Sequence, residues 1–566
     1  MTATTVDERR WHQHYDEGVL ANVDFHEVTL YEAFERTVKR FGQRPALIFM
    51  NCRLTYAEVA EEVCKFSAGL AALGVTKGTR VAVHLPNLPQ TSIAVLAIMR
   101  LGGHVVMTNP LYVPREIEHQ WNDAQVKVAI TGGWLYQSKL AALRPKLPVE
   151  HYVISHVPDY LRFPLNLLAP LKLKQSGLHT KVPAGPGIVE LKALLKGGHA
   201  TPAPAQTQLG DIALLQYTGG TTGPAKGVML SHGNLSYHVQ QLRAWLPTLR
   251  DGEEVALGSL PYFHVFGFTC SMLLSIYTGA AVVLMPNPRD IDRMMSNIQK
   301  HRISLFPAVP ALFNSLNRHP RLTAYDVSSI RCCVSGSAPL PADVLRRFEE
   351  LTGAKISEGF GMTECSPCTH CNPIDGLRKV GSIGVPLPNT DARIVDPDDG
   401  VTDMPVGTEG ELIVSGPQVM LGYWGRDEAT AATIRDGWLY TGDLAVVDDD
   451  GFFRIVGRKK DMILASGYNV YPDEIDRVLA GHPAVFEACT IGIPDEKRGE
   501  TVKAFVALLP GKSATADELA EHCRENLAAY KVPRDIEFRA DLPKSSMMKL
   551  LRRELRAEEL EKRGLD

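Results

Sequence analysis

Cysteine is scarce in this sequence, with ten residues scattered over 566 positions. Such low usage excludes a disulfide framework and indicates a reduced, intracellular protein. The charged residues 1–10 are followed by no apolar segment, so we expect no signal peptide and a cytoplasmic location. A basic excess is also missing, because the net charge is −4 and the sequence pI is near 6.5. We therefore expect no nucleic-acid partner.

Charge is absent from one stretch, since residues 255–288 contain no Asp, Glu, Lys or Arg. A membrane-spanning helix needs about 20 consecutive apolar residues. Here Pro261, His264, Gly267 and Gly279 interrupt the run. We therefore expect a buried helix around 268–277 and a buried strand at 280–285 in place of a span.

The chain is too long for a single core, so two or more domains are expected. Helical periodicity covers 28–42, 56–73 and 90–101, and an apolar run at 81–85 indicates a strand. This alternation predicts an α/β fold with largely parallel sheets. From about residue 458 a smaller unit follows, with helices at 473–480 and 516–527 and strands at 488–493 and 501–509. We place the domain boundary near 457–460.

Residues 158–208 break this alternation and are rich in proline, leucine, lysine and glycine. Within them, residues 160–174 are apolar with a basic end. Two interpretations stay open at this point. The segment lies on a membrane surface as a peripheral contact, or it is an insertion packed against the parent domain.

The richest motif is a loop of glycine and threonine that follows the apolar run 212–217 and precedes Ser231, a candidate helix cap. Glycines let backbone N–H groups approach a phosphate closely, threonines add hydroxyl donors, and lysine adds a positive charge. The pattern differs from a Walker loop, in which Ser or Thr follows the lysine. The loop therefore predicts a polyphosphate ligand, and its candidate residues are Thr218, Gly219, Gly220, Thr221, Thr222, Gly223 and Lys226.

This loop closely resembles the phosphate loop of the adenylate-forming superfamily, which includes acyl-CoA synthetases, luciferases and the adenylation domains of peptide synthetases. The resemblance continues through further motifs over about residues 25–556. It implies a large N-terminal domain, residues 1–457, of mixed, mainly parallel sheets with flanking helices. A small mobile C-terminal α+β domain, residues 458–566, would follow. It also implies ATP, Mg²⁺ and coenzyme A as ligands.

Two motifs match the family's adenine and phosphate sites. In the resemblance, the small-residue turn Gly336, Ser337, Ala338 and Pro339 lines the adenine. The second motif has Phe360 where the family usually has Tyr, which keeps the aromatic face but loses the hydroxyl. Thr363 would hold the α-phosphate, and Glu364, with Thr218, would bind Mg²⁺. The residues of this second motif are Glu358, Gly359, Phe360, Gly361, Met362, Thr363 and Glu364.

Three further positions carry roles by the same resemblance. His264 lies in a loop that the family places beside the reacting carboxylate. Asp443 matches the ribose clamp, because a carboxylate can accept both vicinal hydroxyl protons. Arg458 matches an arginine that contacts the ribose, and Lys460 matches the hinge about which the C-terminal domain swings.

The C-terminal domain carries two more motifs. Gly467, Tyr468 and Asn469 resemble the segment that borders the pantetheine tunnel in the second pose. Lys549 matches the catalytic lysine that contacts the carboxylate and the α-phosphate. Met548 stands where the family has glycine, which bears on the placement of Lys549, and Lys544 is the competing lysine.

The spacing of Cys365, Cys368 and Cys371, with His370 between them, raises zinc or iron–sulfur ligation as an alternative. No second cluster of matching spacing follows, so we favour part of the substrate pocket.

The resemblance implies a fatty acyl-CoA synthetase, most similar to bacterial long-chain fatty-acid ligases. Val265–Phe268, Phe306–Phe313 and the residues after Met362 would line its acyl tunnel. Medium-chain, aryl and methylthio-alkanoate acids stay open as substrates, and so does a homodimer. A fatty-acyl-AMP ligase is the alternative within the fold, and a non-catalytic lipid- or nucleotide-binding homologue is the alternative outside enzymes.

Overall fold

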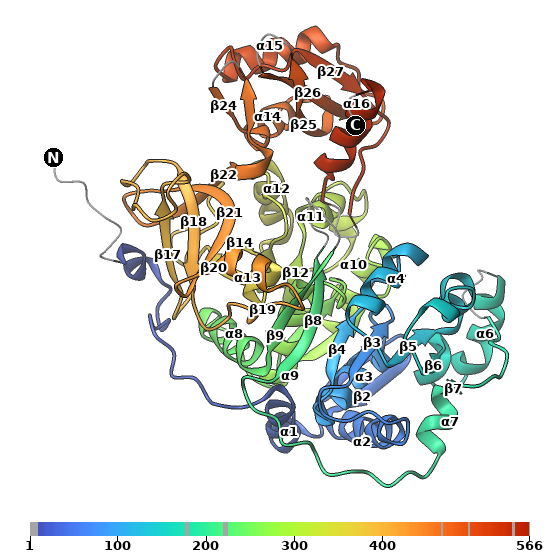
Figure 1. Cartoon of the computed structure of the whole chain (residues 1–566). Helices are drawn as coiled ribbons and strands as arrows, with labels where there is room; N and C mark the ends of the chain where they lie inside the picture. The colour runs from blue at the N-terminus through green and yellow to red at the C-terminus, as the bar shows by residue number, and fades with distance from the viewer. Residues whose placement is uncertain are drawn as a thin grey trace.

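The computed structural model of the chain describes residues 9–175, 180–218, 225–465, 468–495, 499–545 and 549–564. Figure 1 shows a large body and a smaller C-terminal domain, in red, that stands over one edge of it. The body contains two mainly parallel sheets with helices packed around them and an antiparallel sheet beside them. The fold class predicted from the sequence is confirmed.

The first sheet of the body has the order β16-β15-β14-β13-β12-β10-β11-β1-β2, in which the strands from β14 to β1 run parallel. The predicted strand at 280–285 is present in it as β11. Its strands are β1 (Pro45–Phe49), β2 (Cys52–Thr55), β10 (Val255–Gly258), β11 (Ala281–Leu284), β12 (Leu305–Ala308), β13 (Cys332–Ser335), β14 (Ile356–Gly361), β15 (Cys368–Cys371) and β16 (Val385–Pro386).

The second sheet has the order β19-β9-β8-β4-β3-β5-β6-β7, parallel from β8 to β7. The run 212–217 is its strand β8, as predicted, and β9 pairs with β8 in the antiparallel direction. The strands are β3 (Arg80–His84), β4 (His104–Met107), β5 (Val128–Gly132), β6 (His151–Ser155), β7 (Ile188–Glu190), β8 (Ile212–Thr218), β9 (Lys226–Ser231) and β19 (Gly422–Tyr423).

The predicted helices of the body are present where the periodicity places them. Thr55 caps the second helix through the backbone N–H of Glu58, and Gly74, with φ of +85°, follows its end. Ser231 caps α8, as predicted, by accepting from the N–H of Asn234 at 3.0 Å. The helices are α1 (Leu30–Phe41), α2 (Tyr56–Ala72), α3 (Pro89–Arg100), α4 (Pro114–Asp123), α5 (Gly133–Leu135), α6 (Leu165–Gln175), α7 (Leu191–Lys196), α8 (His232–Trp245), α9 (Leu274–Thr278), α10 (Ile291–His301), α11 (Pro310–Asn317), α12 (Ala342–Thr352) and α13 (Asp427–Thr433).

The uncharged stretch 255–288 is buried in the body as strand, helix and strand. A π-helical segment, Gly267–Leu273, leads directly into α9. Among the described residues, no helix combines the length and the apolar character needed to cross a membrane.

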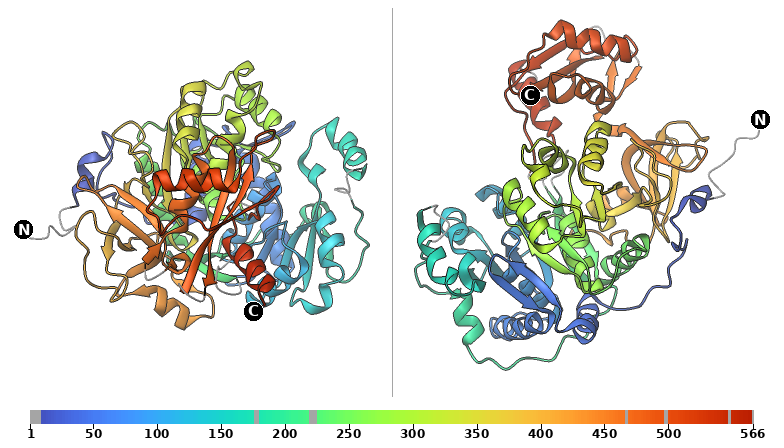
Figure 2. Two further views of the ribbon diagram at one scale, coloured as in Figure 1. Left: turned by 90° about the horizontal axis from the view of Figure 1, so that it is seen from above. Right: turned by 180° about the vertical axis from the view of Figure 1, so that it is seen from behind.

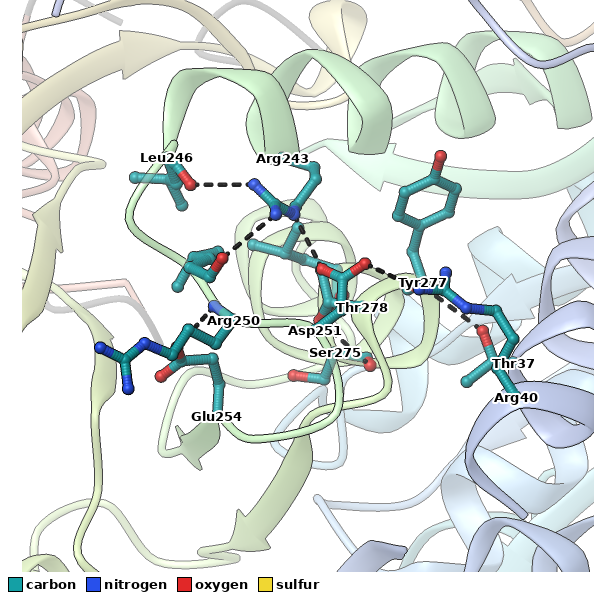
Figure 3. A network of polar contacts seen from close by, with 12 residues as sticks. Thr37, Arg40, Arg243, Leu246, Arg250, Asp251, Glu254, Ser275, Tyr277 and Thr278 are labelled. Carbon is teal, nitrogen blue, oxygen red and sulfur yellow. Dashed lines mark hydrogen bonds and ion pairs between the residues drawn. The ribbon is translucent and has the colours of Figure 1, made fainter. Parts of the chain in front are cut away.

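A polar network closes the body below these helices (Figure 3). Arg243 of α8 donates from Nε to Asp251 at 2.9 Å, and Arg40 of α1 donates to the other oxygen of Asp251 at 3.3 Å. Glu254 lies deeper, where its side chain is bound by Ser304 and Arg331. The network fixes the end of α8 against α1 and β10.

The antiparallel sheet of the body and the C-terminal domain complete the fold. The first contains β17 (Asp391–Val395), β18 (Gly410–Ser415), β20 (Ile434–Arg435), β21 (Trp438–Val447) and β22 (Phe453–Arg458). The C-terminal domain has its own hydrophobic core, built around Ile475, Leu479 and Val506. Its elements are β23 (Ile463–Ala465), β24 (Tyr468–Val470), α14 (Pro472–Ala480), β25 (Val485–Asp495), β26 (Gly499–Leu508), α15 (Ala516–Asn526), β27 (Asp535–Phe538) and α16 (Arg552–Lys562).

Candidate active site

A cleft of about 2970 Å³ lies where the C-terminal domain faces the body. Strands β8, β12, β13 and β14 all contribute residues at or near their carboxyl ends to its wall. Ligands of open α/β sheets bind at this edge, beyond the carboxyl ends of the strands. The cleft is therefore the candidate active site.

Thr218 and Lys226 face each other across the start of the glycine-rich loop. Thr218 ends β8, Lys226 begins β9, and the two are register partners, so the loop connects the strands of a hairpin. Both residues line the cleft, and Lys226 Nζ lies 4.8 Å from the ring centre of Tyr423. The remaining predicted loop residues lie outside the described part of the chain: Gly219, Gly220, Thr221, Thr222 and Gly223.

Tyr423 also positions the predicted magnesium ligand. Its hydroxyl donates to Glu364 Oε1 at 2.8 Å. Burial and the Glu364 carboxylate raise the pKa of Tyr423, so the phenol keeps its proton. Sequence reasoning missed this residue, because no local pattern around Gly422 and Tyr423 marks a contact with a residue 59 positions earlier.

The two predicted adenine segments come together on one wall of the cleft. Gly361 has no room for a side chain, since a Cβ there would lie 1.8 Å from the carbonyl oxygen of Pro367. Glu358 accepts from the N–H of Leu340 at 3.0 Å, and burial raises the pKa of Glu358 to about 7. The predicted residues that line this wall are Gly336, Ser337, Ala338, Pro339, Glu358, Gly359, Phe360, Gly361, Met362, Thr363 and Glu364.

Asp443 and Arg458 form an ion pair that also lines the cleft. Asp443 Oδ1 lies 3.0 Å from Arg458 Nε, and Asp443 is only 3% exposed. Burial raises the pKa of Asp443, against the effect of Arg458. Its second oxygen, Oδ2, has no hydrogen-bond partner among the described residues. Lys460, the predicted hinge residue, lines the cleft two residues beyond Arg458.

Lys549 enters the cleft from the C-terminal domain. The backbone N–H of Ser545 donates to the Lys549 carbonyl at 2.8 Å. Met548 lies outside the described residues. The Arg458 guanidinium and then desolvation lower the pKa of Lys549 to about 8. Lys544 instead forms ion pairs with Glu487, at 2.6 Å, and with Asp541.

His264 lies close enough to Lys549 to feel its charge. Burial, and then Lys549, lower the pKa of His264 to about 4, so the imidazole is neutral at pH 7. Nδ1 accepts from the N–H of Phe266 at 3.2 Å, which leaves the ring proton on Nε2. Gln216 of β8 holds this loop by donating to the Phe263 carbonyl at 2.6 Å, a contact that no sequence motif predicted.

Two predicted residues lie away from the cleft in this pose. Tyr468 and Asn469 are exposed on β24, and the Tyr468 ring stacks on Tyr530 with centres 4.5 Å apart. Neither is among the residues that line the cleft. Gly467 lies outside the described residues.

The predicted acyl tunnel needs one correction. Val265 and Phe266 line the cleft, and so do Pro307, Pro310 and Ala311 of the predicted segment 306–313. Its two end residues, Phe306 and Phe313, are fully buried against each other, with ring centres 5.4 Å apart. Both rings lie in the core and not on the cavity wall, and residue type alone does not reveal that orientation.

The cysteine-rich segment folds as strand β15 and the turn before it. All ten cysteines are free, and Cys368 and Cys371 line the cleft. Within the described ranges, no group of three or more His, Cys, Asp or Glu side chains is placed to hold a metal ion.

Comparison with known proteins agrees with this geometry. The family model for AMP-binding enzymes matches residues 34–424, and the model for their C-terminal domain matches residues 474–549. A long-chain-fatty-acid–CoA ligase from Bacillus subtilis (strain 168) is 43% identical over 98% of this chain and 99% of its own length.

Two solved structures show the same fold. An anthranilate CoA ligase in complex with anthranoyl-AMP has a TM-score of 0.85 and 28% identity, over 95% of this chain and 98% of its own. ATP-bound MatB from Rhodopseudomonas palustris has a TM-score of 0.82 and 29% identity, over 94% and 99%. The resemblance seen in the motifs is confirmed, and the chain belongs to the AMP-binding enzymes of the adenylate-forming superfamily.

Proposed function

We propose that this protein activates a long-chain fatty acid with ATP and transfers the acyl group to coenzyme A. In the first step a carboxylate oxygen attacks the α-phosphorus, the bond to the β-phosphate breaks, and pyrophosphate leaves. In the second step the thiol sulfur of coenzyme A attacks the acyl carbonyl carbon and AMP leaves. The observation that carries this proposal is the meeting of Lys549, His264, Asp443 and Arg458 around one cleft.

Lys549 acts on the charges that change in the first step. Its ammonium contacts the carboxylate and the α-phosphate, where negative charge accumulates. Lys226 and Thr218, with the loop between them, bind the leaving pyrophosphate. His264 donates from Nε2 toward the acyl carboxylate and helps to orient it.

Glu364 and Thr218 are the ligands we propose for Mg²⁺. A carboxylate and a hydroxyl are the oxygen donors that this ion prefers, and both line the cleft beside Lys226. The bond from Tyr423 holds Glu364 in a fixed orientation. When bound, the ion neutralises phosphate charge and favours pyrophosphate as a leaving group.

Two sets of cleft residues hold the nucleoside, one at the ribose and one at the adenine. Asp443 accepts from the ribose hydroxyls through the oxygen that lacks a partner, and Arg458 contacts the same sugar. Phe360 stacks on the adenine, beside Gly336 and the turn that follows it. The other predicted residues of these two sets complete the nucleotide pocket.

The second step needs a different pose of the C-terminal domain. We propose a domain of residues 458–566 that turns about Lys460 on the body formed by residues 1–457. The turn withdraws Lys549 and brings Gly467, Tyr468 and Asn469 to the cleft, where they border the pantetheine arm. The exposure of Tyr468 and Asn469 in the present pose is consistent with this exchange.

A pyrophosphate-release screen tests the proposal, with saturated acids of increasing length, aryl acids and methylthio-alkanoates as substrates. We expect release with long-chain acids, and AMP and acyl-CoA when coenzyme A is added. Acyl-AMP without thioester would identify a fatty-acyl-AMP ligase. A preference for aryl acids would follow the anthranilate ligase among the structural neighbours. Nucleotide binding without any turnover would identify a non-catalytic homologue.

A peripheral membrane contact through α6 is part of the proposal. Phe163 and Leu167 are 76% and 64% exposed on this projecting helix and its entry, and Leu168 is exposed beside them. Such side chains insert into a bilayer interface. Phe163→Ser with Leu167→Ser should abolish flotation with anionic vesicles, whereas flotation equal to the wild type would exclude the contact. The cytoplasmic location and the homodimer stay predictions, tested by cell fractionation and by ultracentrifugation.

A further inference from the structure

One part of the cleft, here called the arm, is lined by residues buried inside the body. Cys270, Leu274 and Trp245 line the same cavity as His264, although they are only 7%, 2% and 2% exposed. They come from the π-helical segment, from α9 and from the end of α8. Cys371 of β15, also buried, lines the cavity too. The arm is therefore lined by buried, mainly apolar side chains.

Trp245 lines this arm, and a second aromatic ring supports it on its other side. Trp245 is the last residue of α8, and the Tyr15 ring packs edge-on against it, with centres 5.0 Å apart and planes at 88°. Tyr15 itself is not among the residues that line the cavity. The indole thus stands between the cavity and the N-terminal arm, residues 9–29, which runs along the outside of the body (Figure 2).

The N-terminal arm is held firmly at this point. The Tyr15 hydroxyl donates to the Pro386 carbonyl at 2.6 Å. The neighbouring Asp16 carboxylate is buried and accepts from the N–H groups of Ile374, at 2.7 Å, and of Gly376. Bonds from several N–H groups to one carboxylate are charge-assisted and strong. Tyr15 cannot move aside without breaking them, so Trp245 has a rigid support.

We propose that Trp245, supported by Tyr15, is the blind end of the acyl-binding arm and sets the longest fatty acid that the enzyme activates. The inference rests on the proposed function. Each methylene that enters the arm gains the free energy of apolar burial, which raises kcat/KM about fourfold. Once the methyl end reaches Trp245, a further methylene forces overpacking and lowers kcat/KM about tenfold. The kcat/KM should therefore rise steadily with acyl chain length and then fall abruptly.

The first test compares length profiles of pyrophosphate release for three proteins. Trp245→Ala removes the end wall, so we expect its optimum at longer acids than that of the wild type. Cys270→Leu adds volume along the arm, so we expect its optimum at shorter acids. Trp438→Phe, which changes a tryptophan outside the cavity, should keep the wild-type profile. Unchanged optima in both cavity variants would overturn the inference.

The second test measures binding without turnover. Bromine quenches indole fluorescence at short range, so a fatty acid brominated at its methyl end should quench Trp245, and one brominated beside the carboxylate should not. Trp245→Phe should abolish this quenching, and Trp438→Phe should retain it. Equal quenching in wild type and Trp245→Phe would contradict the placement. The quenching test with Trp245→Phe also decides whether Trp245 contacts the methyl end if Trp245→Ala fails to fold.

The two tests separate this inference from the proposed function. If no fatty acid supports pyrophosphate release, the proposed function fails, and end-specific quenching still shows whether the arm binds the chain. If long-chain acids are activated but the cavity variants keep the wild-type profile, the function stands and Trp245 is not the end wall.

Discussion

The charge of Lys549 should set the pH dependence of acyl-adenylate formation. Arg458, and after it desolvation in the cleft, lower the pKa of Lys549 from 10.5 to about 8. The step requires the ammonium form, so activity is present below this pKa and is lost as the pH rises through it. Arg458→Gln removes the largest cause of the shift. We therefore expect the variant's profile to fall at a higher pH, although weaker ribose binding lowers its overall level.

The size of the effect follows from the protonated fraction. With a pKa of about 8, Lys549 is about nine-tenths protonated at pH 7 and about one-tenth protonated at pH 9. The kcat/KM of the first half-reaction should therefore fall about tenfold over this range. Lys549→Ala should lose the pH dependence and about two to three orders of magnitude in rate. It should retain thioester formation from supplied acyl-adenylate, because that step uses the other pose.

Single-turnover release of pyrophosphate between pH 6 and pH 10 measures the profile. Lys459→Gln is the matched control, because it also removes one positive charge next to Arg458 in the sequence. The Lys459 ammonium pairs with Glu411 at 3.2 Å, so its loss should not act on Lys549. The control should keep the wild-type midpoint. The role of Lys549 would be refuted if Arg458→Gln did not shift the pH midpoint of pyrophosphate release. It would also be refuted if Lys549→Ala slowed acyl-adenylate formation and thioester formation equally.

Three further outcomes follow from the geometry. Asp443→Asn should raise the KM for ATP roughly 10- to 100-fold, as initial rates would show, because the amide offers one uncharged acceptor oxygen in place of two carboxylate oxygens; an unchanged KM excludes the clamp. Glu254→Gln should lower the free energy of unfolding by roughly 1–3 kcal/mol in urea, because it weakens the bonds that the buried Glu254 carboxylate accepts from Arg331 and Ser304; wild-type stability would show that these bonds add nothing. Gly361→Ala should lower the free energy of unfolding by about 1–3 kcal/mol or more, because the new Cβ would overlap the Pro367 carbonyl oxygen. A melting temperature equal to that of the wild type would show that the backbone around Pro367 moves to make room.

Local pattern predicted much of the fold. Helix α2 starts at Tyr56 and ends at Ala72, close to the predicted 56–73, because its capping threonine and terminal glycine are both adjacent in sequence. Strand β9 was missed, because its sequence shows no alternation of apolar and polar residues. Its partners are β8 and the two-residue strand β19. The orientation of Phe306 and Phe313 was also missed, since both a tunnel and a core favour phenylalanine.

The site was predictable where family motifs are contiguous and not where contacts are distant. Glu364 and Asp443 stand in recognisable motifs. Tyr423, which holds Glu364, and Tyr15, which supports Trp245, are single aromatic residues whose partners lie far along the chain. Only the folded chain brings these pairs together.

The hairpin between β8 and β9 has a consequence for how phosphate is held. A loop that enters a helix offers the positive end of a macrodipole, whereas a loop between antiparallel strands offers almost none. Anion affinity here should then depend on local backbone N–H groups and on discrete charges such as Lys226, without a helix dipole. Added salt screens such charges, so potassium chloride should weaken ATP binding more steeply in this enzyme than in one whose phosphates sit on a helix terminus.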